Sequence, residues 1–149
     1  MNVRVAVDTN ILAYAEGVDP DARQLSAQLL LKRLPEADTI IPVQVLGELY
    51  NVLARKAGWS RSQAQSAIEG WRAAYTTAET SLHAMMVAID LATVHRLRIW
   101  DAVILAVAAD AGCRLLLSED MHDGFDWNGV TVANPFVASP HPLLQAFLR

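Results

Sequence analysis

Short apolar runs alternate along this chain with longer helical segments, and this alternation limits the folds that it can adopt. The runs are too short for helices and almost wholly apolar, which is typical of strands buried on both faces. They occupy residues 3–7, 39–42, 115–117 and 130–133. Because strands separated by helices usually pair in parallel, the sequence predicts an α/β fold with helices on both faces of a mostly parallel sheet.

The segments between these runs carry helical signals. Ser60 and Gln63 form a capping-box pattern, and Gly58 ends the helix that precedes it. The last predicted helix is apolar on nearly every face, so we expect it to be buried. The predicted helices cover residues 22–34, 43–57, a segment beginning at residue 60, 85–97 and 102–111.

The chain's size and composition favour one domain. A length of 149 residues with 53% hydrophobic content can bury a core of its own, so we expect a single domain over residues 1–149, with a short docked tail from about residue 136. No apolar run approaches the length of a bilayer span, and no secretory signal is visible, so we expect no membrane association. A single cysteine, Cys113, indicates an intracellular, cytoplasmic protein.

Net charge does not decide whether the partner is a nucleic acid. The formal charge of -4 argues against one, because phosphate binding usually requires an excess of basic residues. However, four of the 16 acidic residues are candidate metal ligands, and the 12 that remain equal the 12 basic residues in number. Charge therefore neither supports nor excludes an RNA substrate.

Each of these four acids has an ordinary structural interpretation. Asp8 can form a turn after the first strand, Asp101 can be the N-cap of the helix at residues 102–111, and Asp120 can belong to a polar loop. Glu48 lies on a polar helix face that can simply be solvated. The residues of that predicted face, spaced by four, three and four, are Gln44, Glu48, Asn51 and Arg55.

The predicted sheet gives these acids a common location. Carboxyl ends of parallel strands and N-termini of the following helices meet at one edge, which brings Asp8, Asp101 and Asp120 together, and Glu48 can join them from its helix. Two carboxylates 4 Å apart repel by about 4 kcal/mol at an effective dielectric constant near 20. A hard divalent cation compensates for this repulsion, so we expect a site for Mg²⁺ or Mn²⁺.

Four motifs in this order resemble those of PIN-domain nucleases, particularly VapC-type toxins. They are VDTNILAYA, PVQVLGELYNVL, IWDAVILAVAADAGC and LLLSEDMHDG, and the likeness extends from Val3 to about Pro135. The resemblance implies a three-layer α/β/α sandwich and a Mg²⁺- or Mn²⁺-dependent endoribonuclease. It assigns catalysis and metal binding to Asp8, Glu48, Asp101 and Asp120, with supporting roles for Thr9, Asn10 and Ser118.

The last motif departs from many relatives, which have a basic residue and an aromatic residue after the aspartate. Here Met121, His122 and Asp123 follow, so Glu119 and Asp123 become competing ligands, although Asp120 matches the motif position. The resemblance further implies an RNA substrate, a homodimer and a cognate antitoxin protein. A processing nuclease that is not a toxin remains an alternative.

Two other classes of function also remain open. Phosphatases of the haloacid dehalogenase type use a first aspartate as nucleophile, with a second two residues later and a lysine near a later strand. Here Asn10 takes the second position, and the only lysines, Lys32 and Lys56, are on early helices. A non-catalytic interaction domain would fit the mean hydropathy of +0.23 and the four tryptophans.

Overall fold

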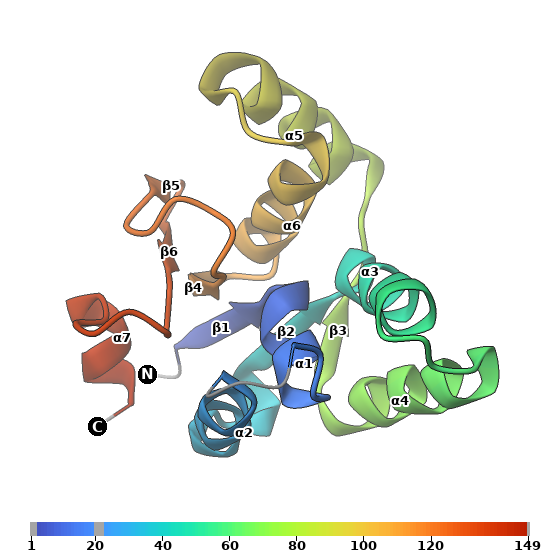
Figure 1. The fold of residues 1–149 in the computed structure, drawn as a ribbon. Coiled ribbons are helices and arrows are strands. Elements are labelled where there is room, and N and C mark those ends of the chain that lie inside the picture. The colour runs from blue at the N-terminus through green and yellow to red at the C-terminus, as the bar shows by residue number, and fades with distance from the viewer. Residues whose placement is uncertain (1–2, 20–22, 149) are drawn as a thin grey trace.

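The computed structural model describes residues 3–19 and 23–148 and is built around a six-stranded sheet (Figure 1). The strand order is β3-β2-β1-β4-β6-β5, and every neighbouring pair is parallel except β5 and β6. The predicted, mostly parallel sheet is therefore confirmed. The strands are β1 (Arg4–Val7), β2 (Thr39–Pro42), β3 (Thr76–Ala78), β4 (Cys113–Leu117), β5 (Asp126–Trp127) and β6 (Val130–Ala133).

Helices cover both faces of this sheet. The helices α5 and α6 pack against each other on one side, and α1 and α2 pack against each other on the opposite side (Figure 1). This arrangement confirms the predicted three-layer α/β/α sandwich. The helices are α1 (Thr9–Ala15), α2 (Arg23–Arg33), α3 (Val43–Asn51), α4 (Arg61–Ala74), α5 (Leu82–His95), α6 (Ile99–Asp110) and α7 (Pro142–Phe147), and a 3-10 turn covers Glu36–Asp38.

The strand order places a topological switch point between β1 and β4. The chain passes outward from β1 through β2 to β3, then returns to the other side of β1 as β4. Val7 pairs with Leu117 in the register of β1 and β4, and the Asp8 amide donates to the Leu117 carbonyl at 2.9 Å. Asp8 and Ser118 therefore lie side by side, in the crevice where open α/β sheets bind ligands.

The helix α6 is buried between the sheet and α5, as its apolar sequence predicted. Its residues 102–108 are almost inaccessible to solvent. It begins at Ile99 with Arg98 as its N-cap, three residues before the predicted start. Asp101 therefore lies in the first turn of the helix, and its interpretation as an N-cap is wrong.

The predicted helix over residues 43–57 changes type partway. The α-helical part ends at Asn51, and a π-helical turn, Val52–Lys56, follows. Because a π turn contains more residues than an α turn, it shifts every later side chain around the helix axis. Gly58, with φ of +71°, ends the helix as predicted.

The helices α1 and α7 and the strands β3 and β5 were not predicted from the sequence. The helix α1 follows β1 without a break, and its apolar sequence conceals the change from strand to helix. The strands β3 and β5 are three and two residues long and lie at the two edges of the sheet. Such short edge strands gain little from burial, so they carry no apolar pattern.

Several predicted boundaries differ from the observed ones by a few residues. The helix α5 begins at Leu82, because the Ser81 side chain accepts a hydrogen bond from the Ala84 amide and so caps it. Ala22, the predicted first residue of α2, lies outside the described residues. The predicted tail docks through buried Leu144 of α7. None of the helices in residues 3–19 and 23–148 has the length and hydropathy needed to cross a bilayer.

Replacing Leu105 by alanine tests the packing of α6. This side chain is fully buried, so its truncation should lower the free energy of unfolding by about 2–5 kcal/mol in a urea titration. The control is Leu25→Ala on α2, where the leucine is 62% exposed and the change should stay within about 0.5 kcal/mol. Equal effects of the two substitutions would contradict the buried position of α6.

Candidate active site

Asp8 is a buried carboxylate at the carboxyl end of β1, with only 3% of its surface exposed. One of its oxygens accepts a hydrogen bond from the Thr9 amide at 2.7 Å, which makes Asp8 the N-cap of α1. The other oxygen accepts from the Ser118 hydroxyl at 2.6 Å and from the Asn10 amide nitrogen at 3.3 Å. The structure thus gives Asp8 a helix-capping role in place of the turn considered for it, and these bonds fix the side chain at the switch point.

Glu48 reaches the same place from α3. The Thr9 hydroxyl donates to one of its carboxylate oxygens at 2.7 Å, and the Gln44 amide nitrogen donates to the other at 3.0 Å. Gln44 lies one helical turn before Glu48, so the polar face predicted for this helix exists at these two positions. Thr9 thus connects the first strand's end to α3.

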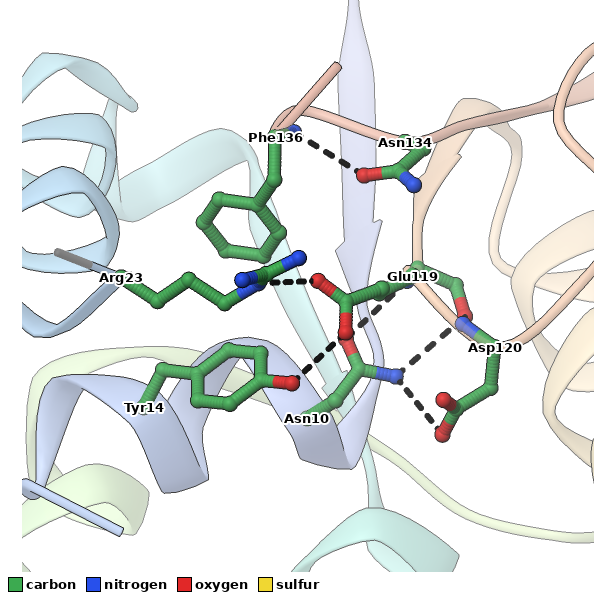
Figure 2. A network of polar contacts seen from close by, with 8 residues as sticks. Asn10, Tyr14, Arg23, Glu119, Asp120, Asn134 and Phe136 are labelled. Atoms are coloured by element: carbon green, nitrogen blue, oxygen red, sulfur yellow. Dashed lines mark hydrogen bonds and ion pairs between the residues drawn. The ribbon is translucent and has the colours of Figure 1, made fainter. Parts of the chain in front are cut away.

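Asn10 and Ser118 hold the loop that follows β4. The Asn10 side chain donates to an Asp120 carboxylate oxygen at 3.2 Å and accepts from the Glu119 amide at 3.1 Å (Figure 2). The Ser118 hydroxyl oxygen accepts from the backbone amides of Asp120 and Met121 at 3.2 and 3.3 Å. These contacts join Asp120 to the residues around Asp8.

Glu119 points in a different direction from Asp120 (Figure 2). Its two carboxylate oxygens accept from the Tyr14 hydroxyl and the Arg23 guanidinium, each at 2.6 Å. The guanidinium carbon also lies 5.7 Å from the ring centres of Tyr14 and Phe136. Burial, followed by the contact with Glu119, raises the pKa of Tyr14 to about 12. The structure therefore engages the Glu119 carboxylate away from the four candidate acids.

Asp123, the other competing residue, is exposed and accepts a hydrogen bond from the Asn134 amide at 2.9 Å. This bond connects the loop after β4 to the segment after β6. The structure thus gives Asp123 a role in holding these two loops together.

Burial and neighbouring carboxylates raise the pKa of two of the four acids, Asp8 and Asp101. Burial is the main cause that raises the pKa of Asp8 to about 7, with smaller contributions from the Asp101 and Glu48 carboxylates, against the hydrogen bonds from Ser118 and Thr9. Burial also raises the pKa of Asp101, followed by the charges of Glu48 and Asp120, while Arg98 opposes them. No Arg or Lys among the described residues forms a salt bridge with any of the four. Arg98 therefore offsets part of the repulsion at Asp101, and no salt bridge in the described part of the chain offsets the rest.

A cleft of about 410 Å³ opens beside Glu48 and Asp120, whereas neither Asp8 nor Asp101 lines it. Glu48, Asn51 and Asp120 line it, and so does Lys56, which no sequence pattern assigned to the site. The π-helical turn explains this change: it carries Lys56 to the face of Glu48 and moves Arg55 away from it. The predicted alignment of Arg55 with Glu48 is wrong, because no sequence signal marked the π turn.

The donor chemistry at this position fits a hard divalent cation. As they stand, the described residues contain no group of three His, Cys, Asp or Glu side chains close enough to hold a metal ion together. Yet the Asp101 and Glu48 carboxylates raise the pKa of Asp8, and no basic side chain of the described residues forms a salt bridge with these acids. A bound cation would offset their negative charge. Asp8, Glu48, Asp101 and Asp120 are the residues that could hold it.

Comparisons with known proteins show which family has this fold. A family model described as the PIN domain matches residues 5–125. The solved structures that are similar include VapC20 of Mycobacterium tuberculosis, described as a sarcin-ricin loop cleaving toxin. Its identity to this chain is 24%, with a TM-score of 0.65, and the match covers 75% of this chain and 86% of VapC20.

Two further structures have the same fold. A toxin-antitoxin complex from Klebsiella pneumoniae matches at 20% identity and a TM-score of 0.65, over 89% of this chain and 98% of the other. VapBC2 from Rickettsia felis, bound to a DNA fragment from its promoter, matches at 20% identity and a TM-score of 0.58, over 79% and 89%. No curated protein sequence matches the chain significantly.

Asp8→Asn should stabilise the protein at neutral pH when divalent cations are removed. The folded-state pKa of Asp8 lies near 7, above its ordinary value of 3.8, so the folded protein binds the extra proton between these values. The stability that this proton on Asp8 contributes is therefore complete below pH 3.8 and is lost as the pH rises through 7. In EDTA at pH 8, Asp8→Asn should raise Tm by several degrees, and the gain should vanish near pH 4.

The control for this measurement is Asp90→Asn on α5, an exposed acid whose removal should leave Tm nearly unchanged at both pH values. Thermal unfolding followed by circular dichroism measures both variants. If Asp8→Asn lowered Tm equally at pH 4 and pH 8, the raised pKa of Asp8 would be refuted.

Proposed function

Because the chain belongs to the PIN domain family, we propose that it is a Mg²⁺- or Mn²⁺-dependent endoribonuclease and the toxin of a toxin-antitoxin pair. The observation that carries this proposal is the buried Asp8, whose pKa is raised by burial and by other candidate ligands, with no basic partner. A site of this kind stores negative charge at the point where an α/β sheet binds its ligands. A divalent cation at that point would activate water for the hydrolysis of an RNA phosphodiester.

In this proposal, Asp8, Glu48, Asp101 and Asp120 bind the cation, directly or through water. When bound, Mg²⁺ or Mn²⁺ supplies Lewis-acid chemistry: it polarises a phosphodiester oxygen and makes a water molecule easier to deprotonate. One of the carboxylates then accepts the proton of the attacking water. The attack forms a bond from the water oxygen to phosphorus and breaks the bond to the leaving oxygen, which takes up a proton.

The neighbouring polar residues orient the acids in this proposal. Thr9 and Ser118 donate to Glu48 and Asp8, so each hydroxyl fixes one carboxylate oxygen, and the Gln44 side chain and the Thr9 amide orient the other oxygen of each pair. Asn10 keeps Asp120 next to Asp8. These bonds hold the acids in place before a cation arrives, which lowers the entropic cost of binding it.

The proposed partners are an antitoxin protein and a second copy of the chain. Similar solved structures are described as toxin-antitoxin complexes, which supports the first. A face of α5 with exposed Leu82, Met86 and Ile89, spaced by four and three residues, supports a homodimer. An RNA substrate and the single buried thiol of Cys113 are consistent with action in the cytoplasm.

The phosphatase interpretation has no comparable support. The position two residues after Asp8 is occupied by Asn10, whose side chain is engaged with Asp8, Asp120 and the Glu119 amide. An amide here bridges two loops and cannot transfer a proton as an aspartic acid does.

Replacing any one of the four acids by its amide should abolish metal-dependent RNA cleavage. Asp8→Asn, Glu48→Gln, Asp101→Asn and Asp120→Asn each remove a charge that binds the cation, so cleavage of a labelled RNA should fall at least about 100-fold. EDTA should stop the wild-type reaction, and Mg²⁺ or Mn²⁺ should restore it. Asp90→Asn is the control and should cleave normally. Full activity of Asp8→Asn would refute the assignment.

Glu119 and Asp120 should respond differently to the loss of their charge. Glu119→Gln weakens the contacts with Arg23 and Tyr14, so it should lower Tm slightly and leave the affinity for Mn²⁺ within about threefold of wild type. Asp120→Asn should leave Tm nearly unchanged and weaken Mn²⁺ binding about tenfold or more. Calorimetric titration with Mn²⁺ measures both. The reverse ranking would make Glu119 the ligand.

A further inference from the structure

A second hollow adjoins the acidic cleft, and its chemistry is the opposite. It measures about 430 Å³, and two arginines, Arg55 and Arg61, line it together with the aromatic residues Tyr50 and Trp59. Asn51 lines both this hollow and the acidic cleft, so the two are neighbours. We call this second hollow the arginine pocket.

The π-helical turn creates the division between the cleft and the arginine pocket. It directs Lys56 to the acidic cleft and Arg55 to the arginine pocket. Arg61 enters from the first residue of α4, which follows Ser60, the N-cap. No acidic residue lines the arginine pocket, and neither arginine forms a salt bridge with a described residue. Although the chain has a net charge of -4, two arginines without a neighbouring acid in this pocket favour the binding of an anion.

We propose that the arginine pocket binds a nucleotide of single-stranded RNA that lies next to the phosphate cut in the acidic cleft. Arg55 and Arg61 contact backbone phosphates, and the rings of Trp59 and Tyr50 pack against the base. This inference rests on the proposed ribonuclease function. It goes beyond that function because it assigns the path of the substrate strand and the residues that contact it.

The lining residues favour RNA over other anions. Guanidinium groups form paired hydrogen bonds with phosphate, and aromatic rings stack on bases of any sequence. A small anion such as inorganic phosphate would not require two aromatic rings beside the arginines. A base that stacks on these rings has to be unpaired, so the pocket selects single strands and loops over duplexes.

The test measures RNA binding without cleavage. All variants are made in the Asp8→Asn background, and fluorescence anisotropy measures binding of a labelled, unstructured RNA of about 12 nucleotides in EDTA. The double substitution Arg55→Gln and Arg61→Gln should weaken binding about tenfold or more. It should also reduce the dependence of log K on log salt by about 0.7 for each phosphate that the variant no longer neutralises.

Matched controls separate this effect from general loss of charge or fold. Arg72→Gln changes an exposed arginine in the last turn of α4, outside the pocket, and should leave both affinity and salt dependence unchanged. Arg55→Lys with Arg61→Lys should keep the salt dependence, because the charges remain.

Trp59→Leu tests the stacking contact. It should weaken binding about tenfold with no change in salt dependence, and Trp59→Phe should retain most of the wild-type affinity. Circular dichroism checks that each variant is folded.

Two failures of the test have different meanings. If the wild-type protein cleaves the RNA with Mg²⁺ or Mn²⁺, but the Arg55 and Arg61 variant binds like Arg72→Gln, the arginine pocket is not a nucleotide site. If the wild-type protein neither binds nor cleaves any RNA, the proposed function fails and this inference fails with it.

Discussion

The site depends on one contact between adjacent strands: the Ser118 hydroxyl donates to the Asp8 carboxylate at the carboxyl ends of β4 and β1. The strand register places these two residues side by side, and the reversal of strand order opens a crevice there. Burial then removes most of the water that would screen the charge of Asp8. The fold thus holds a costly carboxylate in place, and the same position makes it suitable for binding a cation.

The sequence predicted most of the sheet because its buried strands are apolar and short. It also predicted that Asp8, Asp101 and Asp120 would meet, because parallel strands end at one edge. Asn10 joins Asp120 to Asp8 by hydrogen bonds, whereas the interaction of Asp101 with Asp8 is electrostatic. It could not predict the position of Asp101 in the first turn of α6, since Arg98 is an unusual N-cap. Nor could it separate Glu119 from Asp120: that depends on Tyr14 and Arg23, which approach through tertiary packing.

The π-helical turn gives the surface its division of charge. A regular helix would have continued the polar face from Glu48 to Arg55. Arg55 would then lie on the same side of the helix as the cleft. The extra residue in the turn instead assigns Lys56 to the cleft and Arg55 to the pocket. Irregular helical turns are frequent at functional sites, and here the turn separates the acidic cleft from the arginine pocket.

In the proposed function, the four acids together bind a divalent cation. A crystal soaked in Mn²⁺, with diffraction recorded for its anomalous scattering, tests this claim most directly. The account predicts an anomalous peak within ligand distance, about 2.0–2.3 Å, of at least two of Asp8, Glu48, Asp101 and Asp120. A peak held only by other residues, or no peak here at a Mn²⁺ concentration that supports RNA cleavage, would contradict it.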